Sequence, residues 1–370
     1  MLLVSMVGLY IVIFSHKIVA EVEGYSNQID ATNYVYNREK TPPIYIRGLY
    51  LTASSAANPK KRAEIIKLIN DTELNTVVID IKDYTGNVLY ASKVKNVRDF
   101  KTARDVLKNT RDVVADFKKA GIYVIARQTV FQDPVLAAAN PAWAIKSSYG
   151  GLWRDTKGLS WVDPTKKEVW TYNTQIAEEV IKFGFDEINF DYVRFPSDGD
   201  ISTAVYSDIG DGKEAVMHSF YSYLHDRLQN KPAYISVDLF GLTTAAHDTD
   251  LNIGQTLKAA NHEVDYIYPM MYPSHYPDGY LGYANPADHP YEVISDGLTK
   301  AQTIMDGSAT KLRPWLQAFN LGAVYDGEKI RNEIHAAEQA DNVAGWVLWN
   351  ASNTYSSDGL LAKDVPDPNV

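Results

Sequence analysis

Two aspartates, Asp191 and Asp238, each lie at the end of an apolar segment, where paired carboxyl groups could do acid–base and nucleophilic chemistry. Asp191 belongs to residues 187–192 (EINFDY). Side chains alternate along a strand, so Asn189 and Asp191 are expected on the same face. Arg194 follows three residues later, and we expect it to pair with Asp191 and favour its ionised form. The alternative is a purely structural Asp–Arg pair that holds a loop.

Asp238 has a different sequence environment. It belongs to residues 234–239 (YISVDL), is followed by Phe240 and Leu242, and has no basic residue near it in sequence. Apolar surroundings raise the pKa of a carboxyl group and keep its proton on. One charged and one protonated carboxyl group are what glycoside hydrolysis needs, because one acts at the anomeric carbon and the other protonates the leaving oxygen. A helix-capping or loop-bonding role for Asp238 is the alternative.

Other polar and aromatic side chains stand at predicted strand ends and could bind a sugar. Asp80 and Lys82 share a strand face, so we expect them to pair, either as substrate-binding groups or as a structural salt bridge. Asp83 is a reserve candidate for the acid, and His275 could bind a hydroxyl or simply be exposed. Aromatic rings could stack on sugar faces, although each one could equally be core packing. The predicted substrate-binding residues are Tyr50, Asp80, Lys82, Asp83, Arg127, Trp161, Asp163, Asn189, Arg194, Tyr272, His275, Gln317 and Trp349.

Eight short β-branched runs, alternating with amphipathic segments, must position these residues. Runs that are apolar throughout indicate strands buried on both faces, as in a parallel sheet covered by helices. Eight such units predict a (β/α)8 TIM barrel, with enlarged loops after strands 3 and 6 at residues 128–165 and 271–290. An open doubly wound sheet is the alternative, but no Gly-x-Gly-x-x-Gly motif follows the first strand. The predicted strands are 46–51, 76–82, 122–127, 187–192, 234–239, 265–270, 313–319 and 345–350.

Helices are predicted between these strands from apolar spacing and from Gly, Pro and Asn at their ends. Residues 60–70, for example, open after Asn58-Pro59 and carry Ile65, Ile66 and Ile69 on one face. The predicted helices are 60–70, 105–120, 166–183, 213–228, 252–260, 291–305 and 328–340.

Composition narrows the possible functions. The 370 residues carry 36 basic and 46 acidic side chains, a formal charge of −10, which argues against the broad basic face that nucleic-acid binding needs. There are no cysteines, so thiol catalysis, zinc fingers and iron–sulfur clusters are excluded. The sequence contains no His-x-His, His-Glu-x-x-His or Gly-x-Ser-x-Gly motif. We therefore expect neither a metal nor an organic cofactor.

The N-terminal segment reads separately from the barrel. Residues 1–14 (MLLVSMVGLYIVIF) are apolar and are followed by Lys17 and by a small residue, Ala20. The stretch 1–20 is typical of an export signal, with a membrane anchor or a buried element as alternatives. Residues 21–43 are polar and end in Thr-Pro-Pro, which predicts a linker. The catalytic domain is expected over 44–370, in a secreted or cell-surface protein with possible N-terminal membrane association.

Several motifs together resemble a known family. They are Arg47-Gly48-Leu49-Tyr50, residues 75–83 (NTVVIDIKD), Trp161-Val162-Asp163-Pro164, residues 184–196 and residues 268–276 (YPMMYPSHY). In this order they resemble the bacterial glycosyl hydrolase domain catalogued as domain of unknown function 4015, over roughly residues 44–360. That family is similar to (β/α)8-barrel glycoside hydrolases, including the α-amylase-like superfamily.

The resemblance implies specific roles. In α-amylase-like enzymes the strand-4 Asp is the nucleophile and the strand-5 carboxylate is the acid, and these positions correspond to Asp191 and Asp238. The strand-5 acid is usually Glu, and here it is the shorter Asp. This leaves open whether the anomeric configuration is retained or inverted. The expected function is cleavage of glycosidic bonds in a polysaccharide or cell-surface glycan, with retention favoured. A catalytically inactive glycan-binding barrel, or a barrel hydrolase of another bond type, is the alternative.

Overall fold

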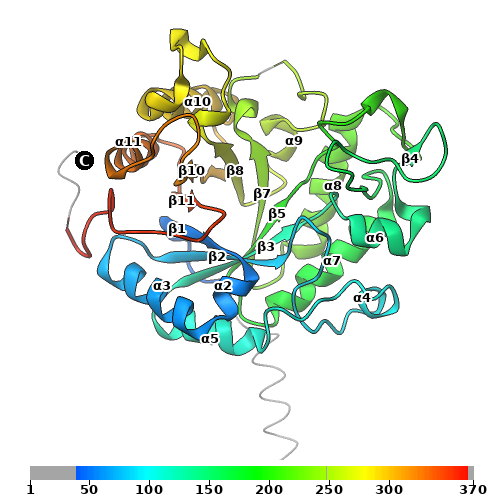
Figure 1. Ribbon diagram of the computed structural model, residues 1–370, viewed down its shortest axis with the longest axis horizontal. Coiled ribbons are helices and arrows are strands. Elements are labelled where there is room, and N and C mark those ends of the chain that lie inside the picture. The colour runs from blue at the N-terminus through cyan, green and yellow to red at the C-terminus, as the bar shows by residue number, and fades with distance from the viewer. Residues whose placement is uncertain (1–38, 247, 366–370) are drawn as a thin grey trace, which may run out of the picture. The chain divides into compact units, whose positions relative to one another are not determined.

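The computed structural model describes residues 39–246 and 248–365. The predicted segments 1–20 and most of 21–43 lie outside the described residues. Eight parallel strands stand in a ring with helices around them (Figure 1). These strands are β1 (Ile46–Leu51), β2 (Thr76–Lys82), β3 (Tyr123–Thr129), β5 (Glu187–Asp191), β7 (Tyr234–Phe240), β8 (Tyr266–Met271), β10 (Trp315–Gln317) and β11 (Gly345–Trp349).

The ring of strands closes. Each strand pairs in parallel with the next in the order given above, and β11 returns to β1 with Gly345 opposite Ile46. Of the seventh predicted strand (313–319), only β10 forms, and a separate short strand, β9 (Lys311–Leu312), precedes it. Pro314 lies between the two and has no N–H for a sheet hydrogen bond. Closure runs through β10 and β8, where Trp315 lies opposite Met270. The predicted (β/α)8 barrel is confirmed, and the open sheet is excluded.

The helices lie outside the strands and match most of the predicted ones. At α3, Asn58 caps the first turn by accepting from Lys60 N at 3.0 Å, and Pro59 fills the first helical position. The predicted helix 252–260 is shorter than expected, with only Leu257–Ala260 helical. The main helices are α2 (Ala53–Ala57), α3 (Pro59–Asp71), α5 (Thr110–Lys119), α7 (Lys167–Ile181), α8 (Lys213–Leu228), α9 (Leu257–Ala260), α10 (Pro290–Ile304) and α11 (Gly327–Glu338).

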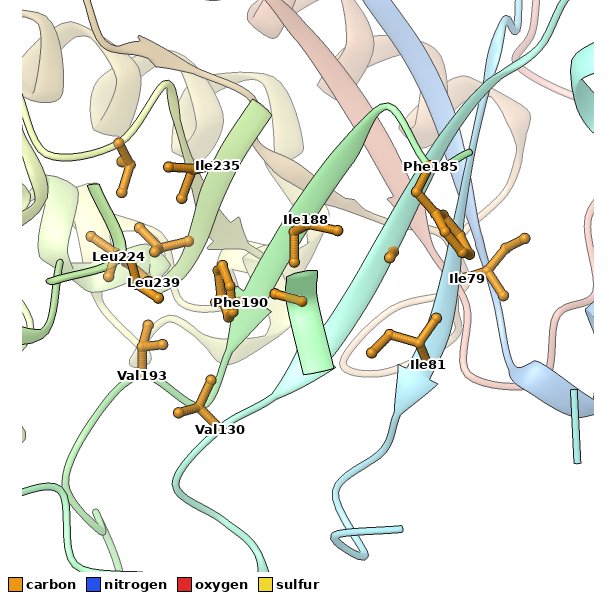
Figure 2. Close-up of a cluster of buried hydrophobic side chains, with 14 of the residues drawn as sticks. Ile79, Ile81, Val130, Phe185, Ile188, Phe190, Val193, Leu224, Ile235 and Leu239 are labelled. Atoms are coloured by element: carbon orange, nitrogen blue, oxygen red, sulfur yellow. The ribbon is translucent and has the colours of Figure 1, made fainter. Parts of the chain in front are cut away.

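Apolar side chains form two layers, one outside and one inside the strands. Figure 2 shows the outer layer, in which Ile188 and Phe190 of β5 pack with Leu239 of β7 and Leu224 of α8. The inner layer contains many rings, including Tyr50, Tyr268 and Trp315. Because side chains alternate along β5, the outward Ile188 and Phe190 leave Asn189 and Asp191 pointing into the barrel.

The loops after β3 and β8 are enlarged, as predicted. Residues 130–166 contain α6 (Pro134–Ala139) and the short strand β4 (Lys146–Ser147), and residues 272–289 contain three short 3₁₀ turns. The loop after β5 is also long and carries β6 (Ala204–Val205), which pairs antiparallel with β4. A further short helix, α4 (Lys95–Asp99), follows β2. No described helix is long and apolar enough to cross a lipid bilayer.

Candidate active site

Arg127 links the acidic side chains at the C-terminal end of the barrel. It lies on β3, between Asp80 on β2 and Asp191 on β5. Its Nη1 donates to Asp80 Oδ1 at 2.7 Å, its Nη2 forms an ion pair with Asp191 Oδ2, and its Nε lies 3.7 Å from Asp238 Oδ2. One buried guanidinium group therefore contacts three carboxyl groups, and the predicted substrate-binding Arg127 lies at the centre of the site.

Asp191 is charge-paired and lies at the last position of β5. Besides the ion pair with Arg127, its Oδ1 accepts a hydrogen bond from the backbone N–H of Tyr192 at 2.5 Å. Tyr192 has a left-handed backbone with φ of 53°, an uncommon conformation for a ring-bearing residue, and it ends the strand. The Asp191 carboxyl group is therefore held by one ion pair and one backbone hydrogen bond.

Asp238 has the opposite environment, although it is near the same guanidinium group. Its Oδ1 accepts from Asn189 Nδ2 and from Trp315 Nε1, each at 2.8 Å, while Oδ2 has no hydrogen bond within the described chain. Burial and the negative charge of Asp191 raise the pKa of Asp238 well above its usual range, and Arg127 and the two donors offset only part of this. The predicted raised pKa of Asp238 is confirmed in direction, and Asn189, predicted to bind substrate, donates to the Asp238 carboxyl group.

The predicted pairing of Arg194 with Asp191 is wrong. Arg194 Nη1 donates to Phe195 O at 3.0 Å and to Ser197 Oγ at 3.3 Å. The left-handed turn at Tyr192 ends the alternation of the strand, so sequence spacing no longer determines the direction of the Arg194 side chain. Arg127, which is 64 residues away from Asp191 in sequence, takes the role predicted for Arg194.

A hollow of about 190 Å³ opens over these groups. It contains both aspartates, Arg127 and Arg194, so the carboxyl groups face a cavity of the size of about one sugar ring. The remaining walls are aromatic or apolar, as in most small-molecule sites. The lining residues are Arg127, Asp191, Tyr192, Arg194, Asp238, Phe240, Met270, Tyr272, Trp315 and Trp349.

Four of these lining residues were absent from the sequence prediction: Tyr192, Phe240, Met270 and Trp315. Side-chain alternation could have predicted Trp315, because it shares a face of β10 with the predicted Gln317. Phe240 and Met270 sit at the ends of β7 and β8, opposite each other in register, and nothing in their residue types marks them for function.

Aromatic rings form one side of the site. Trp349 stacks on Tyr50 with centroids 4.0 Å apart, and the Tyr50 hydroxyl donates to Asp80 Oδ2 at 2.5 Å. Tyr272 and Trp349 also line a second, more open hollow of about 690 Å³, together with His275 and Phe319. Burial lowers the pKa of His275, and its Nδ1 lies 3.0 Å from Ser274 Oγ. Tyr272 and Trp349 therefore border both hollows, and His275 borders only the second.

Lys82 lies away from the hollow, and its predicted pairing with Asp80 is wrong. A β-bulge between Asp80 and Lys82 shifts the register, since Asp80 is opposite Arg127 but Lys82 is opposite Gln128. Lys82 Nζ forms a buried ion pair with Asp133 Oδ2 at 2.8 Å and donates to Thr129 O at 2.7 Å. Asp80 is retained in the Arg127 network, where burial raises its pKa.

The other predicted residues have structural contacts outside the hollow. Asp83 closes its own loop by accepting from Thr85 N at 3.0 Å. Asp163 accepts from Ser207 N at 2.8 Å and joins the loops after β3 and β5. Gln317 accepts from Ser274 Oγ at 2.8 Å and supports the loop after β8.

Trp161 lies behind the hollow and supports it indirectly. Its ring faces the Arg194 guanidinium group at 4.9 Å, and its Nε1 donates to Asp155 Oδ2 at 3.1 Å. Within residues 39–246 and 248–365, no group of three or more His, Asp or Glu side chains is placed to hold a metal ion.

The fold and the site define a (β/α)8-barrel domain with an acidic pocket at the C-terminal ends of its strands, where such barrels carry their active sites. A family model described as "Putative glycosyl hydrolase domain" matches residues 48–355. The chain belongs to this family, and the resemblance seen in the sequence is confirmed.

Solved structures show the same architecture. The glycoside hydrolase domain of PgaB (BpsB) from Bordetella bronchiseptica is 15% identical, with a TM-score of 0.62 over 83% of this chain and 94% of its own. The α-galactosidase of Thermus thermophilus is 12% identical, with a TM-score of 0.54 over 90% of this chain and 67% of its own. At these identities the likeness concerns the fold alone.

A hypothetical protein from Ruminiclostridium thermocellum is more similar in sequence. It is 36% identical, with a TM-score of 0.48 over 51% of this chain and 96% of its own. No curated protein sequence matches the chain.

Proposed function

We propose that this protein is a glycoside hydrolase that cleaves a polysaccharide or cell-surface glycan with Asp191 and Asp238 as its catalytic pair. The observation that carries the proposal is the contact of both carboxyl groups with one guanidinium group, at the base of a hollow lined by rings. Membership of a glycosyl hydrolase domain family supports the same reaction class.

In this mechanism the two aspartates have different roles. Asp191, ionised beside Arg127, is the nucleophile that attacks the anomeric carbon. Asp238 keeps its proton, donates it to the leaving glycosidic oxygen, and then accepts a proton from the incoming water. Asn189 and Trp315 orient the Asp238 carboxyl group through hydrogen bonds to Oδ1.

We further propose retention of anomeric configuration. Retaining enzymes hold their carboxyl groups about 5–5.5 Å apart, whereas inverting enzymes need room for a water molecule between the carboxyl group and the sugar. A single guanidinium group that reaches both Asp191 and Asp238 supports the shorter separation. Proton NMR of the first product anomer distinguishes the two outcomes.

The test of the reaction class is hydrolysis of a polysaccharide panel, measured by release of reducing ends. The wild type should release sugar from at least one member, and Asp191→Asn should reduce that rate by about 10³-fold or more. Asp83→Asn is the matched control, because Asp83 is an aspartate on the same rim that lies outside the hollow and bonds to Thr85 in its own loop, and it should keep wild-type activity. Binding of a glycan without any cleavage would instead favour an inactive binding barrel.

Export to the cell surface remains part of the proposal, and it depends on residues 1–20, which lie outside the described residues. The supporting observation is the apolar stretch 1–14 followed by small residues near Ala20. Cell fractionation of the full chain against a chain that starts at residue 39 is the direct test, and retention of both forms in the cytoplasm would contradict it.

A further inference from the structure

Arg194 is a buried cation whose charge has no carboxylate partner. Its side chain is 7% exposed, and its Nη1 donates only to two neutral acceptors, Phe195 O and Ser197 Oγ. Among the described residues no carboxylate forms an ion pair with it, whereas the two other deeply buried arginines, Arg127 and Arg313, are each paired. An unpaired buried charge is costly, so a protein retains one where something else binds it.

The side chain is aimed into the hollow by aromatic rings. The guanidinium group lies 4.9 Å from the Trp161 ring, 5.2 Å from the Tyr192 ring and 4.8 Å from the Phe240 ring. Rings attract the cation through its flat face but accept no hydrogen bonds in its plane. Arg194 lines the same hollow as Asp191 and Asp238, and its Nη2 and Nε form no hydrogen bond with the described residues.

The surrounding charges leave the Arg194 cation available to a ligand. Asp191 and Asp80 are both bonded to Arg127, and Asp238 accepts hydrogen bonds from Asn189 and Trp315. The carboxylates of Asp191, Asp198 and Asp155 act on Arg194 only at longer range, without an ion pair. A planar guanidinium group in a desolvated wall matches the two oxygens of a carboxylate, sulfate or phosphate.

We propose that Arg194 binds an anionic substituent of the glycan, so that the substrate is an acidic polysaccharide bearing carboxylate, sulfate or phosphate groups. This inference rests on the proposed function, because it assigns the substrate class of the same hollow. The acidic substituent would lie on the sugar ring that occupies the cavity. That ring would be next to the glycosidic bond that Asp191 and Asp238 cleave.

The test compares matched acidic and neutral oligosaccharides by isothermal titration calorimetry. The pairs are tetragalacturonate with galactotetraose, sulfated with desulfated neocarratetraose, and phosphorylated with plain mannopentaose, so that the three anion sources are distinguished. The protein is the full chain carrying Asp238→Asn, which blocks proton donation. Asp191→Asn is unsuitable here, because it would free Arg127 to bind the anion.

We expect the acidic member of at least one pair to bind about tenfold tighter or more. Arg194→Gln should abolish that preference, Arg194→Lys should retain part of it, and the exposed control Arg154→Gln should leave it unchanged. Equal binding within every pair, no binding by any acidic member, or a preference that survives Arg194→Gln would overturn the inference. The pairwise comparison needs no change at Arg194, so it holds even if that variant folds poorly.

Hydrolysis by the wild type separates the two proposals. Acidic binding without cleavage of any member would contradict the glycoside hydrolase proposal and leave the Arg194 assignment standing. Cleavage of neutral glycans, with an unchanged rate in Arg194→Gln, would support the glycoside hydrolase proposal and contradict the Arg194 assignment.

Discussion

At the scale of single residues, Asp191 and Asp238 lie near the same arginine, Arg127, but have different electrostatic environments because their other contacts differ. Asp191 bonds to the Arg127 guanidinium group and to a backbone N–H. Asp238 is more deeply enclosed and receives only side-chain donors, Asn189 and Trp315. In the proposed mechanism, environment rather than residue type therefore distinguishes the nucleophile from the acid.

Trp315→Phe tests the control of the Asp238 proton. The indole N–H stabilises the charged form of Asp238 and lowers its pKa, so its loss should raise that pKa further. An acid acts only below its pKa, so the alkaline limb of the kcat/KM profile should move to higher pH. The pH–rate profile is the measurement.

The control for this change is Trp346→Phe. Trp346 is equally buried, and its Nε1 donates to a carboxylate, Glu338, outside the hollow. Its removal should leave the alkaline limb in place. An unchanged alkaline limb of the kcat/KM profile in Trp315→Phe would contradict the proposal that Asp238 is the acid.

The sequence predicted the aspartates but not their partner. The apolar flanks of Asp238 predicted the direction of its pKa shift, but the causes are burial in the barrel and the charge of Asp191 on the neighbouring strand. The contact of Asp191 with Arg127 joins two strands through the barrel register, and sequence spacing carries no information about it. Arg194 is close to Asp191 in sequence, but the left-handed backbone of Tyr192 between them turns the chain, so closeness in sequence does not predict a pair.

At the scale of elements, the β-bulge in β2 separates Asp80 from Lys82. Asp80 joins the hollow, while Lys82 reaches Asp133 in the loop after β3. Asp133 also caps α6 by accepting from Leu136 N at 2.7 Å, so one buried ion pair fixes both a strand end and a rim helix. No residue type in 76–82 marks the bulge, which is why alternation misplaced Lys82.

Lys82→Met should destabilise the protein without touching the hollow. Removing one partner of a buried ion pair leaves Asp133 uncompensated and costs about 3–5 kcal/mol. The same change at Lys67, which pairs with Asp71 on the surface of α3, should cost less than about 1 kcal/mol. Urea unfolding of both variants measures this, and equal losses would show that the Lys82–Asp133 pair contributes no more than a surface pair.

At the scale of the whole domain, the sequence predicted the strands and the barrel better than it predicted the side-chain contacts in the hollow. Strand boundaries such as 46–51 and 76–82 match because β-branched runs buried on both faces are a strong local signal. Eight of them in one chain favoured a barrel, and the pairing of β8 with β10 closes it. The predicted helix 252–260 was mostly wrong, since Asn252 and Gly254 both take left-handed backbone conformations there.

Closure of the barrel places strand ends that are far apart in sequence around one hollow. One experiment can therefore test the central claim, that Asp191 and Asp238 share a site. If Asp191 and Asp238 act as one catalytic unit, removing both should harm hydrolysis little more than removing the more important one. The measurement is kcat/KM for the wild type, Asp191→Asn, Asp238→Asn and the double variant on the best glycan of the panel. We predict losses of about 10³-fold or more in each single variant and a double variant close to the worse of the two. Near-wild-type activity in either single variant, or losses that simply multiply, would contradict a shared site.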